Sequence, residues 1–120
     1  MAPPYVPDRG YLVWLTFSPQ AGHEQAGRRP ALVLSPEGYN RKVGLALFFT
    51  ITSQIKDYPF EVKLPENLGV EGVVLSDQIK SLDWRVRRVE LIGKIPRVVV
   101  MEVLEKATNL LFPNDNKSFQ

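Results

Sequence analysis

Short runs of apolar residues, separated by Pro and Gly, make up most of the chain. They are rich in β-branched and aromatic residues and end at turn-forming residues, which predicts β-strands. The expected strands are residues 11–17, 29–34, 45–52, 59–62, 72–81 and 89–92, with a single helical turn at 37–41. Short antiparallel strands with this punctuation are typical of a small barrel or sandwich.

A different period governs the C-terminal region. Apolar residues recur there at spacings of three and four, which predicts a helix from Pro96 to about Leu111. The expected apolar stripe is Val100, Val103, Leu104, Ala107, Leu110 and Leu111, and the expected outer face is Glu102, Glu105, Lys106 and Asn109. The predicted organisation is an N-terminal segment at residues 1–8, one domain at 9–112 and a disordered polar tail at 113–120.

Two expected strands contain polar residues whose positions follow from the alternation of side chains along a strand. In the third expected strand, Thr50 and Thr52 share one face, where a hydroxyl either donates to a phosphate or simply suits a strand. In the fifth, Asp77 falls on the expected apolar face. A buried carboxylate needs donors or a cleft. The alternative is a bulge near Ser76 that turns Asp77 outward.

Composition narrows the classes of protein. A chain of 120 residues, 44% of them hydrophobic, accommodates one domain. The absence of Cys excludes disulfide scaffolds and thiolate chemistry. His23 is the single histidine and no metal-binding motif is present, so we expect neither a metal nor another cofactor. Without a signal peptide or an apolar run of about 20 residues, the expected protein is cytoplasmic and free of the membrane.

Basic residues are candidates for contact with a polyanion, and the formal net charge is +2. One group, either a solvated face or a polyanion-binding surface, surrounds Trp84 and consists of Lys80, Arg85, Arg87, Arg88, Lys94 and Arg97. In a long loop at 18–27, His23 and Glu24 precede Arg28 and Arg29. A guanidinium fork suits phosphate, whereas the alternative is a solvated loop with a weak ion pair.

Ordered blocks of residues resemble the MazF/PemK (Kid) family of toxin endoribonucleases from bacterial toxin-antitoxin pairs. The resemblance covers residues 9–111. The blocks are Arg9-Gly10, residues 22–35 (GHEQAGRRPALVLS), Asn40-Arg41, Thr52-Ser53, residues 58–62 (YPFEV) and residues 72–83 (GVVLSDQIKSLD).

This resemblance implies a compact SH3-like barrel with a C-terminal helix, of the MazF/Kid/CcdB toxin type. It also implies a homodimer whose groove binds single-stranded RNA, and metal-independent cleavage by the 2′-hydroxyl that leaves 2′,3′-cyclic phosphate and 5′-hydroxyl ends. Such a toxin inhibits translation and growth. The implied partner is a cognate antitoxin with an acidic, disordered C-terminal tail.

The family's functional residues correspond to positions of this chain. The resemblance assigns catalysis to Glu24, Arg29 and Thr52, while the Kid-like branch uses residues that match His23 and Asp77. Leu75 stands where that branch has an arginine, which favours Arg29 as the acid over the Kid-like arrangement. Since a guanidinium holds its proton tightly, a purely electrostatic role for Arg29 stays open. An acid-base role for His23 also stays open. The expected RNA contacts are Gln25, Arg28, Ser53, Gln54, Lys56, Tyr58, Gln78, Lys80 and Arg85.

Two other functions share this fold class. Related toxins poison DNA gyrase, but they depend on a tryptophan near the C-terminus, and residues 116–120 have none. A non-catalytic SH3-like binding module is the third possibility. Homodimerisation is also suggested by apolar residues on both faces of the first strand, where Leu12 and Trp14 alternate with Val13 and Leu15.

Overall fold

The computed structural model describes residues 5–17 and 27–113. Its elements confirm the expected order of strands with a helix at the C-terminus. They are β1 (Tyr11–Thr16), β2 (Arg28–Val33), α1 (Glu37–Val43), β3 (Leu45–Thr52), β4 (Glu61–Lys63), β5 (Val73–Asp83), the 3-10 turn η2 (Trp84–Val86), β6 (Glu90–Lys94) and α2 (Arg97–Leu111). The helix α1 spans seven residues, longer than the single turn expected, because Gly44 ends it in the left-handed conformation at φ 82°.

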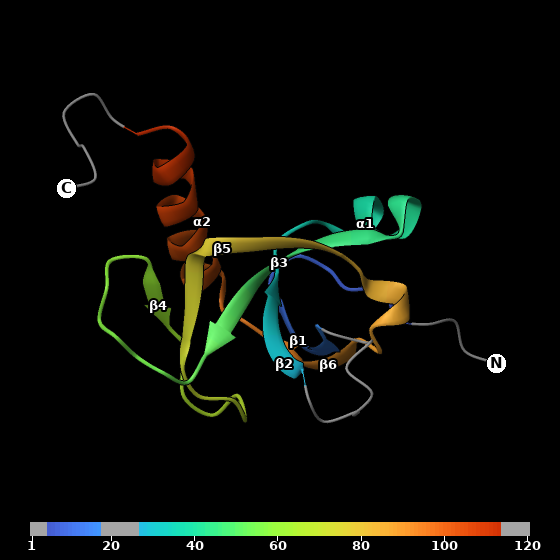
Figure 1. Cartoon of the computed structure of the whole chain (residues 1–120), viewed down its shortest axis with the longest axis horizontal. Coiled ribbons are helices and arrows are strands. Elements are labelled where there is room, and N and C mark those ends of the chain that lie inside the picture. Colours follow the sequence, from blue (N-terminus) through green and yellow to red (C-terminus); the bar gives the residue numbers. More distant parts are fainter. Residues whose placement is uncertain (1–4, 18–26, 114–120) are drawn as a thin grey trace.

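The strands form one antiparallel sheet in the order β4-β5-β3-β2-β1-β6. Figure 1 shows the sheet curling into a half-barrel, with α2 beside β4 and β5 on the left of the view and α1 near β3 on the right. The mainly β fold with a C-terminal helix is therefore confirmed. None of the helices within the described residues is long and apolar enough to cross a membrane.

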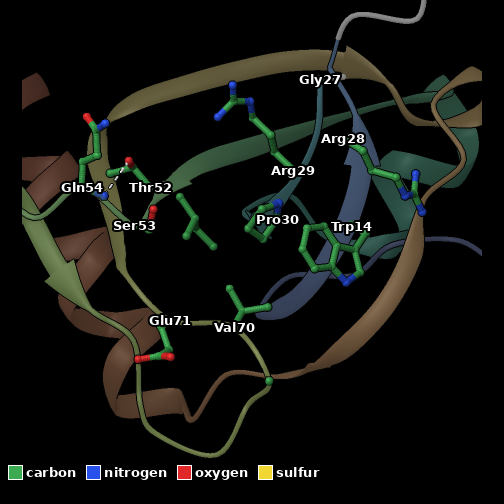
Figure 2. A pocket seen from close by; sticks show the side chains of 12 residues that line it. Trp14, Gly27, Arg28, Arg29, Pro30, Thr52, Ser53, Gln54, Val70 and Glu71 are labelled. Carbon is green, nitrogen blue, oxygen red and sulfur yellow. Dashed lines mark hydrogen bonds between the residues drawn. The ribbon is translucent and has the colours of Figure 1, made fainter. Parts of the chain in front are cut away.

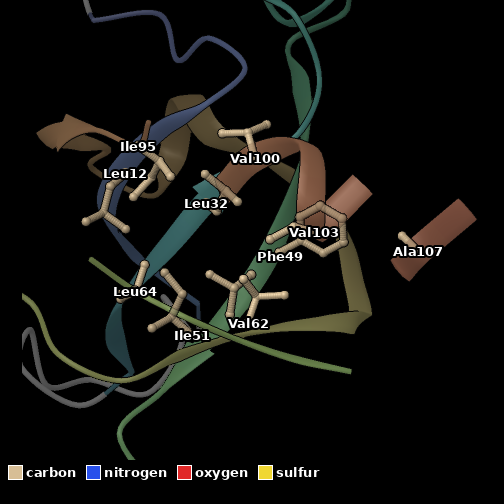
Figure 3. Close-up of a cluster of buried hydrophobic side chains, with 11 residues drawn as sticks. Leu12, Leu32, Phe49, Ile51, Val62, Leu64, Ile95, Val100, Val103 and Ala107 are labelled. Carbon is tan, nitrogen blue, oxygen red and sulfur yellow. The ribbon is translucent and has the colours of Figure 1, made fainter. Parts of the chain in front are cut away.

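Each face of the sheet carries a buried apolar cluster, which explains the continuous apolar runs in its strands. One cluster, closed by α2, includes Leu12, Phe49 and Val103 (Figure 3). The other includes Val13 and Phe48 and is covered by the N-terminal segment and by residues 82–89. Three of the four alternating residues of β1 are buried in these clusters, whereas Trp14 is half-buried.

A bulge in β5 decides the position of Asp77. Two steps along β3, from Phe49 to Ile51, correspond to five steps along β5, from Ile79 to Val74. Ser76 turns inward with no exposed surface, and its hydroxyl donates to the Phe60 carbonyl at 2.6 Å. Asp77 is exposed. Its expected place on the apolar face is wrong, and the alternative of a bulge is confirmed.

The predicted stripe of α2 is only partly buried. Val100, Val103 and Ala107 are buried. Leu110 and Leu111, expected to continue the stripe, are 40% and 67% exposed because the end of the helix projects beyond the sheet (Figure 1). Lys106, expected on the outer face, is half-buried and donates to the Pro59 carbonyl at 2.7 Å.

Candidate functional site

A cavity of about 910 Å³ opens where β2 begins and β3 ends. Its size lies in the range of ligand sites, about 300 to 1,000 Å³. Strand ends and the loop before β5 supply its walls, which are Trp14, Gly27, Arg28, Arg29, Pro30, Ile51, Thr52, Ser53, Gln54, Gly69, Val70 and Glu71. Figure 2 shows Trp14 on one side and Thr52 with Gln54 on the opposite side.

Arg29 and Thr52, two of the expected catalytic residues, meet at this cavity because of strand register. β2 and β3 are antiparallel, and their last paired residues at this end are Ala31 and Thr50. Continued by two residues on each strand, the same register sets Arg29 opposite Thr52. Alternation also gives them the same face of the sheet. The structure therefore brings together a guanidinium and a hydroxyl that lie 23 residues apart in the sequence.

The two neighbouring arginines differ in their partners. Arg28 donates to the Glu90 carboxylate at 3.0 Å and to the Thr16 hydroxyl at 3.4 Å. Its guanidinium is thus held against β1 and β6. Arg29 is exposed, and no hydrogen bond or ion pair occupies it within the described residues. Arg29 is the guanidinium better placed to bind an incoming anion.

Thr52 has a hydroxyl whose proton is available. Its Oγ1 accepts a hydrogen bond from the Gln54 amide at 3.1 Å. A hydroxyl has one proton and two acceptor lone pairs, so this bond orients the oxygen and leaves the proton for another acceptor. A phosphoryl oxygen in the cavity is such an acceptor.

A second cavity, of about 250 Å³, lies on the other side of Thr52. Four of the expected RNA contacts line it together with Thr52, and they are Gln54, Lys56, Tyr58 and Gln78. The loop that carries Lys56 is held in place because the Glu61 carboxylate accepts both the Lys56 and the Asp57 amides at 2.9 Å. Thr50 is buried and donates to the Gln78 side chain at 3.1 Å.

Asp77 and Tyr58 form a pair at the surface. The Tyr58 hydroxyl donates to the Asp77 carboxylate at 2.6 Å. Burial, and then this hydrogen bond, raise the pKa of Tyr58 to about 12. Asp77 lines neither of the two cavities. Its carboxylate is engaged in holding Tyr58 beside the second cavity.

Trp84, at the centre of the basic group, is part of the buried core. Trp84 is 6% exposed, and its indole donates to the Asn40 carbonyl at 2.9 Å. It therefore offers no aromatic surface to a polyanion. Arg85 pairs with Asp83 at 3.1 Å, and this pairing lowers the pKa of the Asp83 carboxyl. Lys80 and Arg85 line neither cavity.

Three expected site residues, His23, Glu24 and Gln25, lie outside the described residues. Glu24 is three residues from Gly27 along the chain, and Gly27 lines the larger cavity. Among the residues that the structure describes, no group of three or more His, Cys, Asp or Glu side chains is placed to hold a metal ion.

Sequence reasoning missed the wall opposite Arg29. Val70 and Glu71 precede β5 and enter the cavity from the far side (Figure 2). Trp14 also lines it, although its spacing had suggested only an apolar strand position. The one signal in the sequence was Gly72, a glycine directly after Glu71, which marks a close approach of backbone.

The chain matches a known family over most of its length. The sequence model for the PemK-like, MazF-like toxin of type II toxin-antitoxin system matches residues 8–111. The chain is 54% identical over 83 residues to the endoribonuclease toxin MazF of Escherichia coli strain K12, covering 69% of this chain and 74% of that protein.

Solved structures agree with this match. The crystal structure of MazF from Deinococcus radiodurans superposes with a TM-score of 0.81 at 59% identity, covering 90% of this chain and 98% of the other. A MazE-MazF crystal structure from the same organism gives a TM-score of 0.80 at 53% identity, covering 89% and 96%.

Proposed function

The chain belongs to the PemK-like, MazF-like toxins of type II toxin-antitoxin systems, and on this premise we propose that it is an endoribonuclease that cuts single-stranded RNA at the Arg29 cavity. The observation that carries the proposal is the convergence of Arg29 and Thr52 on one cavity at adjoining strand ends. Relatives named as endoribonucleases support the activity. By cutting mRNA, the protein would inhibit translation and growth.

The proposed reaction needs no group from outside the chain and its substrate. A base removes the 2′-hydroxyl proton, the 2′-oxygen bonds to phosphorus, and the bond from phosphorus to the 5′-oxygen breaks. The leaving 5′-oxygen takes up a proton, so the products are a 2′,3′-cyclic phosphate and a 5′-hydroxyl end. Cleavage therefore requires a base, a proton donor and charge that stabilises the phosphorane.

Four residues of the chain fit these requirements. Glu24 is the proposed base. His23 is the proposed source of the proton for the leaving 5′-oxygen, and it is also the rival for the base. Arg29 supplies positive charge and paired donors to the phosphoryl oxygens. Its role is electrostatic, because a guanidinium keeps its proton in proteins. Thr52 donates a hydrogen bond from its hydroxyl to an oxygen of the same phosphate.

The activity is tested by incubating the purified protein with a long, weakly structured RNA in EDTA. Fragments whose 5′ ends accept phosphate from polynucleotide kinase without prior phosphatase treatment are expected. Mapped cuts should share a motif of about three to seven unpaired nucleotides, because unstacked bases expose their edges to loops. Intact RNA at equimolar protein would contradict the nuclease proposal, and equal cutting of duplex RNA would contradict the preference for single strands.

We propose a homodimer on new grounds. Beyond the bulge, residues 77–81 of β5 are all exposed, and among the strands that the structure describes this part of β5 pairs with β3 alone. Ile79 is 40% exposed there, and α2 adds the exposed Leu110 and Leu111. An exposed strand with one apolar side chain, Ile79, and a helix end with two exposed leucines are surfaces that a second copy would bury.

The proposed partner is a cognate antitoxin, as in the MazE-MazF complexes of similar structures. Its acidic, disordered tail would compete with RNA for Arg29 and the neighbouring basic side chains. A peptide of that tail should therefore raise the apparent KM for RNA. Undiminished RNA binding with antitoxin at saturation would exclude competition at this groove.

A further inference from the structure

The larger cavity offers more than a phosphate site requires. Arg29 and Thr52 are two of its lining residues, yet its volume is about 910 Å³ and further walls are Trp14, Pro30, Ile51 and Val70. These side chains are apolar or aromatic, and none of them contributes charge to a phosphate. A phosphodiester bound at Arg29 and Thr52 would leave this part of the cavity empty. The unused walls therefore indicate a second ligand group that is flat and largely apolar.

Trp14 is the aromatic side chain of this part of the cavity. It lies on β1 between β2 and β6, where Pro30 and Glu90 are its register partners. Its neighbours along the strand, Val13 and Leu15, have no exposed surface, whereas Trp14 is half-buried. Its indole forms no hydrogen bond among the described residues, although such an N–H usually finds a partner when buried. Aromatic surface left open beside cationic groups is a typical platform for stacking bases.

Trp14 and Arg29 lie on opposite faces of the sheet. Alternation gives Trp14 the face of Leu12, which belongs to the cluster under α2. Arg29 has the face of Ala31, which belongs to the other cluster. Both residues nevertheless line one cavity. A nucleotide bound there can place its phosphate at Arg29 and its base against Trp14.

Glu71 adds a preference among bases. Its carboxylate lines the same cavity, on the side opposite Arg29 (Figure 2), and it has no hydrogen bond or ion pair within residues 27–113. An ionised carboxylate only accepts hydrogen bonds, so it repels phosphate and attracts amino groups. Adenine, cytosine and guanine carry exocyclic amino groups, whereas uracil and thymine do not.

We propose that Trp14, Val70 and Glu71 form a nucleobase subsite, in which an amino-bearing base stacks on Trp14 and donates to Glu71 while its phosphate lies at Arg29. This subsite rests on the proposed function and names part of its substrate specificity. Trp14 and Glu71 are specificity residues, and neither takes part in the transfer of protons or the attack on phosphorus.

The test uses the full chain and single-stranded heptamers that cannot be cut because they lack the 2′-hydroxyl. The probes are oligo(dA), oligo(dC), oligo(dT) and an abasic heptamer with the same number of phosphates. Tryptophan emission is recorded for the wild type and for Trp14→Phe, which retains only the buried Trp84. Oligo(dA) and oligo(dC) should quench the wild type in a saturable way, oligo(dT) should bind about tenfold more weakly, and the abasic chain should leave the emission unchanged. In Trp14→Phe the quenching should be lost.

Two further variants separate a binding role from a structural one. Glu71→Gln replaces an acceptor by a group that also donates, so it should narrow the difference between oligo(dA) and oligo(dT) to less than threefold. Trp14→Leu should weaken oligo(dA) binding about tenfold or more, since it removes the aromatic face on which the base stacks. Circular dichroism checks that each variant is folded.

Outcomes for the subsite are distinct from those for the nuclease. Equal quenching by the abasic heptamer, or equal affinity of the wild type for oligo(dA) and oligo(dT), would overturn the subsite even if RNA were cut. Conversely, RNA left intact by the wild type would overturn the nuclease proposal, while base-dependent quenching of Trp14 would still identify a nucleobase site.

Discussion

Gly72 lies directly against the backbone of Thr52. A Cβ atom built on Gly72 would stand 2.2 Å from the Thr52 carbonyl oxygen, and its φ is +130°. Only glycine accommodates both the contact and this conformation. The contact with Gly72 thus fixes the position of the end of β3, which carries Thr52, the proposed hydroxyl donor.

We expect Gly72→Ala to destabilise the fold and to slow RNA cleavage. The strained φ alone costs about 1 to 3 kcal/mol. A displacement of Thr52 by about 1 Å would reduce the single-turnover rate about a hundredfold. Urea unfolding and cleavage under native conditions measure the two effects.

Gly38 provides the matched control. A Cβ at Gly38 meets nothing within 4 Å, and the residue lies in α1. Gly38→Ala should leave cleavage unchanged and raise the free energy of unfolding by about 0.5 to 1 kcal/mol. A Gly72→Ala variant with wild-type stability and rate would show that the close contact does not position Thr52.

Arg29→Ala should nearly abolish cleavage while leaving the fold intact. The guanidinium is exposed and unpaired in the described part of the chain, so its removal costs little stability. By analogy with the loss of one oxyanion donor, the single-turnover rate should fall about a hundred- to a thousandfold. Arg97→Ala, an exposed arginine at the start of α2, is the control. A folded Arg29→Ala enzyme that cuts RNA at the wild-type rate would remove Arg29 from the site.

Stability should fall with alkaline pH in a way that depends on Tyr58. The pKa of Tyr58 is raised to about 12 in the folded protein, against an ordinary value of 10.0. The folded chain therefore keeps a proton that the unfolded chain releases. This contribution is complete below pH 10 and is lost as the pH rises through 12.

Urea unfolding at several pH values from 9 to 12 measures this dependence. The free energy of unfolding should fall more steeply in the wild type than in Tyr58→Phe over that window. Asp77→Asn removes the carboxylate that accepts the hydrogen bond of the Tyr58 phenol, so it should reduce in part the slope of the free energy of unfolding against pH. Identical slopes for all three proteins would mean that the pair contributes nothing to alkaline sensitivity.

Leu111→Lys should weaken the proposed homodimer. Leu111 is 67% exposed in the single chain, and burying a leucine is worth about 1.5 to 3 kcal/mol. Light scattering of the wild type should give about twice the chain mass of 13.6 kDa. The variant should dissociate at concentrations about tenfold higher or more. Val98→Lys, at a 75% exposed position near the other end of α2, should leave the mass unchanged. A wild type of single-chain mass at micromolar concentration would refute the dimer.

Local patterns in the sequence determined most of the elements, and a resemblance carried by short blocks of residues gave two residues of the proposed site. The alternation in β3 predicted which residues share a face, and the structure assigns Phe49 and Phe48 to opposite clusters as expected. The spacing of Val100, Val103 and Ala107 predicted the buried side of α2. Arg29 and Thr52 were assigned through the resemblance of residues 22–35 and 52–53 to a known family, because charge and alternation alone left a solvated loop and an ordinary strand position open.

Tertiary structure decided what depends on register and on contacts between distant segments. The bulge at Ser76 shifts the pairing of β5 with β3, which exposes Asp77 although alternation set it inward. Trp84 is buried because it packs in the cluster around Phe48, where the Asn40 carbonyl, 44 residues away, accepts a hydrogen bond from its indole. Trp14 and Glu71 meet in one cavity only because the sheet curls. Periodicity reports the faces of one strand, whereas a site is made by several strands whose twist and register arise from packing of the whole chain.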